Sequence, residues 1–300
     1  MSTTPTPKVT KAVIAAAGFG TRFLPQTKAM PKEMLPLIDK PIIQYVVEEL
    51  VAAGIKDIII ISGSNKRSIE DHFDTPNQDL VSNLQAGGAK KEPLLREVEA
   101  ISNMANFIYV RQKGPYGNAT PVACASHLIG NEPFIYTFAD DFFKASPGRT
   151  QQLIAAHTKY GGSILACKRV EDDAEYDRYG FAAGESLAEG IIKVNQIVEK
   201  PGKAKAPSAM ASVSGYLLTP HIFSYIEDAI AAYDGGELMI QPIMQTMIDD
   251  GLGFHACEIA NGTYYDTGDK LEYLKTAVAF ALERDDIGPE LLQFLRKKLQ

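Results

Sequence analysis

The chain has 300 residues, of which 45% are hydrophobic and 22% charged, and these proportions are typical of a globular protein with a sizeable core. Its formal net charge of −7 disfavours nucleic acid as a partner, because surfaces that bind a phosphate backbone are usually basic. The three cysteines are far apart and no apolar run is long enough to cross a membrane, which predicts a cytoplasmic protein without a zinc site, disulfides or a membrane partner.

The first part of the chain has the pattern of an α/β protein. Residues 12–17 are small or apolar and predict a buried strand, and Pro41 is expected to open a helix that ends at Gly54. Four consecutive isoleucines in 57–62 predict a second buried strand. Strand, helix and strand in this order indicate a parallel βαβ unit, so we expect ligands at the carboxyl ends of the strands.

The remaining segments continue this alternation. Turn residues interrupt helical patterns in residues 63–105, which predicts a helical insertion. Further strands are expected at 106–112, 133–139, 163–168, 191–198, 210–218 and 254–259, and helices up to 129, from Ser146-Pro147, and at 220–232, 271–284 and 289–299. We expect a disordered tail at 1–8, a single domain at 9–284 and a C-terminal helix at 285–300.

A glycine loop directly follows the first strand. Ala17, Gly18, Gly20 and Thr21 stand at the turn, and Arg22, Lys28 and Lys32 bring three cations close behind it. Glycines let backbone amides approach an anion closely, so the stretch favours a phosphate-rich ligand. Position 23 is Phe rather than the third glycine of a dinucleotide fingerprint, and no Gly-Lys-Ser/Thr tripeptide occurs, which excludes both common phosphate loops.

A second loop, residues 111–119, leads from a strand into a helix. The Gln112 side chain carries both a donor and an acceptor, which suits the edge of a pyrimidine base, and Gly117 permits a close approach of the backbone. On its own, a glutamine in this position is more often a solvated residue at the end of a strand.

Carboxylates end two later segments. Asp140 and Asp141 follow the strand at 133–139, and Asp266 lies in a turn before a helix; hard oxygen ligands of this kind suit Mg²⁺. Aspartates also serve as turn formers and helix caps. Glu199 and Lys200 stand at a strand exit before Pro201, where a carboxylate can accept from sugar hydroxyls and an ammonium can meet a phosphate, or where the two can form a plain surface pair.

Four motifs in this order resemble those of the sugar nucleotidyltransferase family: G-x-G-T-R with a following P-K, the aspartate at the strand end, E-K-P, and D-x-G. The stretch PKEMLPLIDKPIIQYV is similar to the bacterial uridylyltransferases of that family. The resemblance covers residues 9–284. It implies a Rossmann-like nucleotidyltransferase fold, with a mixed, mainly parallel central sheet flanked by helices, a small additional β-element and C-terminal helices.

The resemblance also implies an activity, namely transfer of a uridylyl group from UTP to glucose 1-phosphate with release of pyrophosphate. Arg22 and Lys32 would hold the pyrophosphate and Lys200 the attacking phosphate. The implied nucleotide contacts are Ala17, Gly18, Gly20, Thr21, Glu33, Gln112 and Gly117, the sugar-phosphate contacts are Gly180, Glu199, Lys200 and Gly215, and the Mg²⁺ ligands are Asp140 and Asp266. Alignment with the family favours Asp140 over Asp141.

The segment Gly236–Pro242 departs from the family pattern G-E-x-Q-L-T-D after its first two residues. An enzyme for dTTP or another sugar 1-phosphate therefore remains an alternative, as does a homologue that binds nucleotide sugar without turnover. The family is commonly oligomeric, so we expect a homo-oligomer, a dimer or a tetramer.

Overall fold

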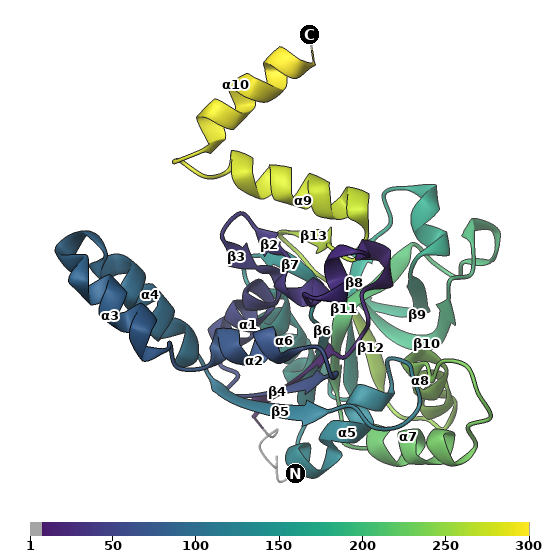
Figure 1. The fold of residues 1–300 in the computed structure, drawn as a ribbon. Helices are drawn as coiled ribbons and strands as arrows, with labels where there is room; N and C mark the ends of the chain where they lie inside the picture. The colour runs from purple at the N-terminus through teal and green to yellow at the C-terminus, as the bar shows by residue number, and fades with distance from the viewer. Residues whose placement is uncertain (1–7, 300) are drawn as a thin grey trace.

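The computed structural model describes residues 8–299, so most of the tail predicted at 1–8 lies outside the described part. Its centre is one nine-stranded sheet (Figure 1). The strand order is β5-β4-β1-β6-β11-β8-β12-β10-β9. None of the helices in the described range is long and apolar enough to cross a membrane.

One half of the sheet is parallel. It contains β5 (Asn106–Arg111), β4 (Asp57–Ser62), β1 (Lys11–Ala16) and β6 (Phe134–Phe138). The isoleucines of β4 are all fully buried, because helices cover both faces of this half. All four strands lie within one or two residues of the ranges expected from their apolar runs.

The other half is mostly antiparallel. It contains β11 (Met210–Leu218), β8 (Ser163–Arg169), β12 (Phe254–Glu258), β10 (Ile191–Glu199) and β9 (Gly180–Ala188). β11 runs antiparallel to β6, β8 and β9, while β8 and β12 are parallel. The sheet is therefore mixed, which confirms the predicted α/β fold class.

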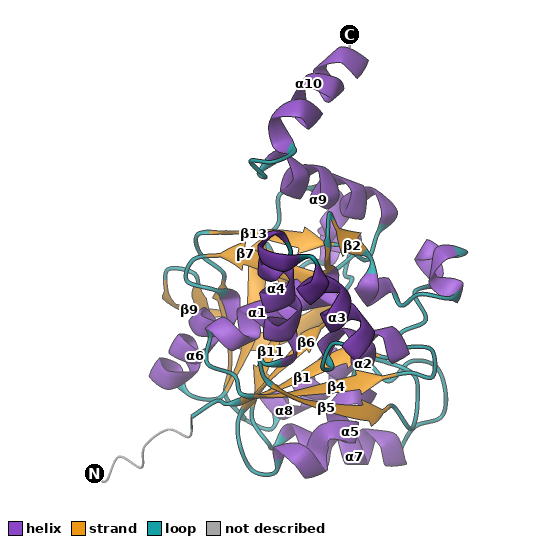
Figure 2. Ribbon diagram, turned by 60° about the vertical axis from the view of Figure 1, so that its left-hand side comes forward, coloured by secondary structure: helices purple, strands orange, loops and turns teal. Residues whose placement is uncertain are grey.

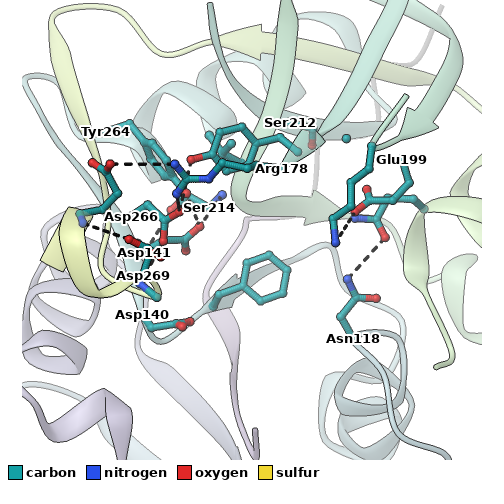
Figure 3. Close-up of a pocket in the computed structure, with 18 of the residues that line it drawn as sticks. Asn118, Asp140, Asp141, Arg178, Glu199, Ser212, Ser214, Tyr264, Asp266 and Asp269 are labelled. Carbon is teal, nitrogen blue, oxygen red and sulfur yellow. Dashed lines mark hydrogen bonds and ion pairs between the residues drawn. The ribbon is translucent and has the colours of Figure 1, made fainter. Parts of the chain in front are cut away.

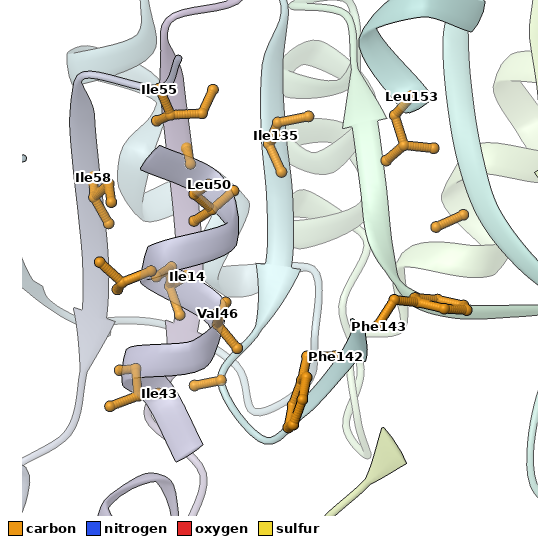
Figure 4. Close-up of a cluster of buried hydrophobic side chains, with 14 of the residues drawn as sticks. Ile14, Ile43, Val46, Leu50, Ile55, Ile58, Ile135, Phe142, Phe143 and Leu153 are labelled. Atoms are coloured by element: carbon orange, nitrogen blue, oxygen red, sulfur yellow. The ribbon is translucent and has the colours of Figure 1, made fainter. Parts of the chain in front are cut away.

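Helices cover the sheet on both sides (Figure 2). α1 (Ile42–Ala52), α2 (Arg67–Phe73) and α6 (Arg149–Tyr160) cover one face, and α5 (Thr120–Ile129), α7 (Ile222–Ala231) and α8 (Ile240–Asp249) cover the other. In the first layer, Ile43, Val46 and Leu50 of α1 pack against Ile14 and Ile58 of the sheet (Figure 4). The core therefore has two parts, one on each side of the sheet.

Two helical pairs extend beyond these layers (Figure 1). α3 (Gln78–Ala86) and α4 (Glu92–Ser102) form an arm within residues 63–105, and α9 (Lys270–Leu282) and α10 (Gly288–Lys298) end the chain. α9 is anchored by Phe280, whose ring meets Tyr45 of α1 edge-on at 5.1 Å between centroids. Its outer face carries exposed Leu271, Leu274, Val278 and Leu282 in one helical stripe.

Two small two-stranded sheets complete the fold. β2 (Pro36–Leu37) pairs with β3 (Lys40–Pro41), and β7 (Asp141–Ala145) pairs antiparallel with β13 (Gly262–Asp266). The register of the second pair sets Asp141 opposite Asp266. Two aspartates that are far apart in the sequence are thereby brought to the same place.

Several elements differ from the expectations. The sequence analysis did not predict β7, β9, α8 or β13. Pro41 is the N-cap of α1 rather than its first residue, and α6 begins at Arg149 with Gly148 as its N-cap, so the predicted start at Ser146-Pro147 is wrong. Gly148 donates its amide to the Gln151 side chain at 3.0 Å, which stabilises this later start.

Candidate active site

The loop after β1 lies at the carboxyl edge of the parallel half-sheet. Gly20 has φ +66°, a left-handed conformation that glycine adopts without strain. A Cβ atom there would lie 3.2 Å from side-chain carbons of both Thr27 and Lys32. The Thr27 hydroxyl donates a 2.7 Å hydrogen bond to the Gly20 carbonyl. The loop therefore has a shape that is fixed by Thr27 and that requires glycine.

Lys32 and Glu33 follow in a short 3-10 turn, Lys32–Met34. Burial opposes the charge of Lys32, but the carboxylates of Asp140 and Glu33 outweigh this effect and raise the Lys32 pKa, so the ammonium stays charged. Lys32 Nζ is hydrogen-bonded to Asp140 Oδ2. Glu33 is 0% exposed, and its two oxygens accept from Lys66 Nζ at 3.0 and 2.7 Å. Lys32 therefore meets Asp140, while Glu33 anchors the turn to Lys66.

A cavity of about 720 Å³, the first cavity, opens over these loops. It is lined by all seven predicted nucleotide contacts and by both predicted pyrophosphate cations. The full set of lining residues is Ala15, Ala17, Gly18, Phe19, Gly20, Thr21, Arg22, Lys32, Glu33, Gln112, Tyr116, Gly117, Asn118, Pro121, Phe138, Asp140, Gly236, Glu237 and Met239. Lys28 is exposed and does not line it. The structure thus brings two of the three predicted cations together.

Gly117 has a different neighbour from the one expected. It has φ +132°, and a Cβ atom there would lie 2.2 Å from the Leu238 carbonyl oxygen. The Leu238 amide donates to the Tyr116 carbonyl at 2.6 Å, the Leu238 carbonyl accepts from the Ala119 amide at 3.0 Å, and the Ile240 amide donates to Asn118 Oδ1 at 2.8 Å. Glycine at 117 therefore lets residues 116–119 interlock with residues 238–240.

A second cavity of about 670 Å³ adjoins the first and shares Arg22, Asn118, Phe138, Asp140 and Met239 with it. It is lined by strand ends and turns from both halves of the sheet. The other lining residues are Asp141, Asp177, Arg178, Tyr179, Gly180, Glu199, Lys200, Ser212, Val213, Ser214, Tyr216, Gln241, Tyr264, Asp266, Gly268, Asp269, Leu271 and Glu272. Figure 3 shows the aspartates grouped at one side of this cavity and Glu199 at the other.

The two adjacent aspartates have different surroundings. Asp141 Oδ2 accepts from the Ser214 amide at 3.1 Å and from the Tyr264 hydroxyl at 2.9 Å. Burial, together with the carboxylates of Asp140 and Asp266, raises the pKa of Asp141 to about 7. Asp140 instead meets the Lys32 ammonium and borders both cavities. The geometry therefore favours Asp140 over Asp141 as the reactive-site carboxylate.

Asp266 converges on the same point from β13. A Cβ atom at Gly268 would lie 3.1 Å from Asp140 Oδ2, 3.3 Å from Asp266 Oδ1 and 3.4 Å from Arg22 Nη1, so the two carboxylates and the Arg22 guanidinium meet around Gly268. Asp266 Oδ2 accepts from the Arg178 guanidinium at 2.6 Å and from the Tyr179 hydroxyl at 3.3 Å. Each carboxylate is therefore paired with a cation, Asp140 with Lys32 and Asp266 with Arg178, as expected for two negative charges that lie close together.

Within the described residues, no group of three or more His, Cys, Asp or Glu side chains is arranged as a metal site. Asp140 and Asp266 are nevertheless hard oxygen donors that meet around Gly268. Such a pair suits a cation that keeps water or phosphate oxygens as its remaining ligands, which is the usual behaviour of Mg²⁺.

Glu199 and Lys200 lie where β10 leaves the sheet. Glu199 is paired in register with Gly180, and a Cβ atom at Gly180 would lie 2.7 Å from Glu199 Oε2. That oxygen is buried and has no hydrogen-bond partner among the described residues. Burial raises the pKa of Glu199, with the Lys200 ammonium, 3.8 Å away, opposing the shift. This oxygen therefore lies against Gly180, while the Glu199 residue lines the second cavity.

Gly215 is placed differently from the other predicted contacts. It does not line either cavity, and a Cβ atom there would lie 2.2 Å from the Tyr136 carbonyl oxygen. Its glycine therefore serves the packing of β11 on β6. Its neighbours Ser212, Val213 and Ser214 line the second cavity instead.

Sequence reasoning missed several lining residues, including Asn118, Arg178, Gln241 and Tyr264. Arg178 directly precedes the Tyr179-Gly180 motif, and Asn118 directly follows Gly117, so proximity to a motif was the available signal. Gln241 and Tyr264 come from α8 and β13, elements that the sequence did not predict.

Comparison with known proteins identifies the family. The profile of the nucleotidyl transferase family matches residues 11–283. The chain belongs to this family. A curated relative, UTP–glucose-1-phosphate uridylyltransferase 1 of Staphylococcus saprophyticus, is 42% identical over 292 residues, which cover 96% of this chain and 98% of the relative. The predicted family resemblance is thereby confirmed.

Solved structures of nucleotidyl transferases agree with the observed fold. A UDP-glucose pyrophosphorylase complexed with UDP-glucose superposes with a TM-score of 0.81 at 36% identity, covering 92% of this chain and all of that one. A UTP-bound UGPase from Acinetobacter baumannii gives a TM-score of 0.85 at 33% identity, covering 96% and 99% of the two chains. The mixed sheet and its flanking helices are therefore the fold of this family.

Proposed function

We propose that this protein transfers a uridylyl group from UTP to glucose 1-phosphate and releases pyrophosphate. The observation that carries the proposal is the junction of the two cavities at Arg22 and Asp140, which line both. A reaction between two anionic substrates requires adjoining sites with charge control at their meeting point. The names of the relatives, and the UDP-glucose and UTP bound in two of the similar solved structures, support this substrate pair.

The first cavity is suited to UTP. Its glycine loop and its two cations, Arg22 and Lys32, favour a triphosphate, and Gln112 supplies a donor and an acceptor for the edge of uracil. We assign nucleotide contacts to Ala17, Gly18, Gly20, Thr21, Gln112 and Gly117. Glu33 would act indirectly, since Lys66 occupies both of its oxygens.

The second cavity is suited to glucose 1-phosphate. The Glu199 carboxylate, which lines this cavity, would accept from sugar hydroxyls, Gly180 lets the backbone of β9 approach that carboxylate closely, and Lys200 would meet the phosphate. The role of Gly215 is to support the wall, because it packs on Tyr136 and not on the cavity.

Asp140 and Asp266 would hold Mg²⁺ beside Gly268. When bound, the ion would neutralise negative charge on the phosphates. Lys32 and Arg178, which pair with these carboxylates in the structure, are then available to phosphate oxygens.

The chemical step needs positioning more than it needs a protein nucleophile. A phosphate oxygen of glucose 1-phosphate attacks the α-phosphorus of UTP, a new P–O bond forms, and the bond to the bridging α–β oxygen breaks, so pyrophosphate leaves with the electron pair. The attacking oxygen is already ionised at neutral pH, so no general base is assigned. Arg22 and Lys32 would stabilise the leaving group, and Lys200 would orient the nucleophile.

The test is pyrophosphate release in the presence of Mg²⁺, with UTP, dTTP, CTP, ATP and GTP each paired with the 1-phosphates of glucose, galactose, mannose and N-acetylglucosamine. We expect strong turnover only with UTP and glucose 1-phosphate. Preference for dTTP or another sugar would move the substrate assignment and keep the reaction. Binding of UDP-glucose without turnover of any pair would contradict an enzymatic role.

We further propose that the single domain spans residues 9–284, that the protein acts in the cytoplasm, and that it forms a homo-oligomer. Unpaired Cys124, Cys167 and Cys257 fit a reducing compartment. The exposed stripe of α9, Leu271, Leu274, Val278 and Leu282, is an apolar face that a second copy could cover.

A further inference from the structure

A buried guanidinium lies directly behind the wall of the second cavity. Arg149, the first residue of α6, is 1% exposed. Its Nη2 donates to Glu49 Oε2 at 2.9 Å, and Glu49 also accepts from the Thr150 amide and hydroxyl. Its Nη1 donates to the Thr137 hydroxyl at 2.8 Å, to the Ser214 hydroxyl at 2.7 Å and to the Ser214 carbonyl. One side chain thus joins α1, α6, β6 and β11.

The segment that Arg149 holds is irregular. Ser212 is paired with Cys167 of β8, but Tyr216 is paired with Leu165, so β11 carries a bulge between Ser212 and Tyr216. Inside the bulge Ser214 has φ +61°, a left-handed conformation that is uncommon for a residue other than glycine. A strained residue persists where its surroundings hold it, and here the main-chain carbonyl and the side chain of Ser214 are both held by Arg149.

The bulge sits where β11 changes neighbours. Ser212 is in register with Gly180 of β9, and Tyr216 is in register with Tyr136 of β6. β6 leads to Asp140, whereas Gly180 is in register with Glu199. The bulge therefore sets the spacing between the aspartate side and the Glu199 side of the second cavity, and Ser212, Val213 and Ser214 form the wall between them.

We propose that Arg149, fixed by Glu49, is a positioning residue for the sugar phosphate. The inference rests on the proposed function, because it takes the second cavity as the glucose 1-phosphate site. Arg149 touches no ligand; it holds the Ser214 bulge, and the bulge holds the cavity wall. A buried ion pair is in itself weak evidence for stability, since a well-packed apolar residue is often as stable, and this leaves a geometric role as the reason for its presence.

The molecule offers a matched control on the other side of the cleft. Lys66 and Glu33 form a second buried ion pair, 1% and 0% exposed, which anchors the turn of Lys32 beside the first cavity. Both pairs bury one cation and one carboxylate under a binding loop. Loss of either pair lowers stability, but each would disturb a different substrate.

The experiment measures KM for each substrate and thermal midpoints for Arg149→Met, Arg149→Lys and Lys66→Met. We expect Arg149→Met to raise KM for glucose 1-phosphate at least about tenfold while KM for UTP changes less than about twofold. Arg149→Lys should recover part of the loss, because an ammonium can still donate to Ser214 but cannot also reach Glu49 in the same geometry. Lys66→Met should raise KM for UTP instead.

Equal changes in both KM values, or a rise in KM for glucose 1-phosphate with Lys66→Met as large as that with Arg149→Met, would show general destabilisation and overturn the proposal. If Arg149→Met does not fold, Glu49→Gln replaces it in the experiment, because glutamine keeps one oxygen acceptor but pairs more weakly with Arg149. An unchanged ratio of the two KM values in Glu49→Gln would then contradict the positioning role of Arg149. Failure of the proposed function is recognised separately, since the wild-type protein would then not turn over UTP and glucose 1-phosphate at all.

Discussion

The two halves of the cleft are built by different means. The first cavity lies at the carboxyl ends of parallel strands, and short loops that follow the strands directly supply its glycines and cations. The second cavity lies beside the bulge in the antiparallel half, and it is lined by residues from β9, β10, β11, β13 and α9. A triphosphate can be held largely by local backbone and charge, whereas a sugar phosphate needs groups gathered from the whole chain.

The largest effect on activity is expected at Asp140, whose carboxylate borders both cavities. Asp140→Asn should lower kcat by about 10³-fold, equivalent to about 4 kcal/mol, because it removes the charge that pairs with Lys32 and that would hold the proposed Mg²⁺. Asp141→Asn is the matched control. Its amide oxygen can still accept from Ser214 and Tyr264, so we expect a loss below about tenfold. Steady-state kinetics with folding checked by circular dichroism compares the two, and a larger loss at Asp141 would reverse the assignment.

The next effects should separate the halves. Lys200→Met should raise KM for glucose 1-phosphate by about 10²-fold, and Lys32→Met should raise KM for pyrophosphate in the reverse reaction by a similar factor, because each residue lines only one of the two cavities and each change removes one charge-assisted phosphate contact. The measurement is KM for all four substrates, in both directions. If either variant raised KM equally for the substrates of both cavities, the division of the cleft into two sites would be wrong.

A smaller effect concerns pH and belongs to the second cavity alone. Burial raises the pKa of Glu199, so this carboxylate takes up a proton at a higher pH than an ordinary glutamate as the solution is acidified. KM for glucose 1-phosphate should therefore rise a few-fold between about pH 8 and about pH 5 relative to the Glu199→Gln variant, which cannot titrate there. Protonation of the substrate phosphate affects both proteins equally, and parallel profiles would exclude a role for the Glu199 charge.

The smallest effect on activity is expected from the C-terminal helices. Leu274→Glu with Val278→Glu places charge on the α9 stripe and should reduce the proposed homo-oligomer to monomers in light scattering, with activity within about twofold. Lys275→Glu, a charge change on the same helix outside the stripe, is the control. An unchanged mass would show that subunits associate elsewhere, or not at all.

The sequence predicted most of the parallel half because its signals are local. Four adjacent isoleucines identify β4, and the glycines and cations after β1 lie within a few residues of one another. The missed elements lack such signals. β9 is rich in small and polar residues and is exposed over half its length, and α8 follows directly on a stretch that departs from the family motif.

The same distinction applies to the site. Sequence motifs predicted four site residues, Glu199, Lys200, Asp140 and Asp266. The environment that distinguishes Asp141 from Asp140 depends instead on Tyr264, which is 123 positions from Asp141 in the sequence. Arg149 reaches Ser214 across 65 residues and Glu49 across 100. No periodicity or spacing reports such contacts, because they are set by how the strands pack.

The interlock between residues 116–119 and residues 238–240 bears on how this scaffold can be re-engineered. Leu238 is bonded on both sides to the loop at Gly117, and the segment borders both cavities through Met239. The two stretches should therefore be exchanged together, although the bonded residues Asn118 and Ile240 are 122 positions apart. Grafting Gly236–Gln241 from a relative of different substrate preference should yield an active chimera only when residues 116–119 are transferred with it, and equal activity of the single graft would show that the stretches are independent.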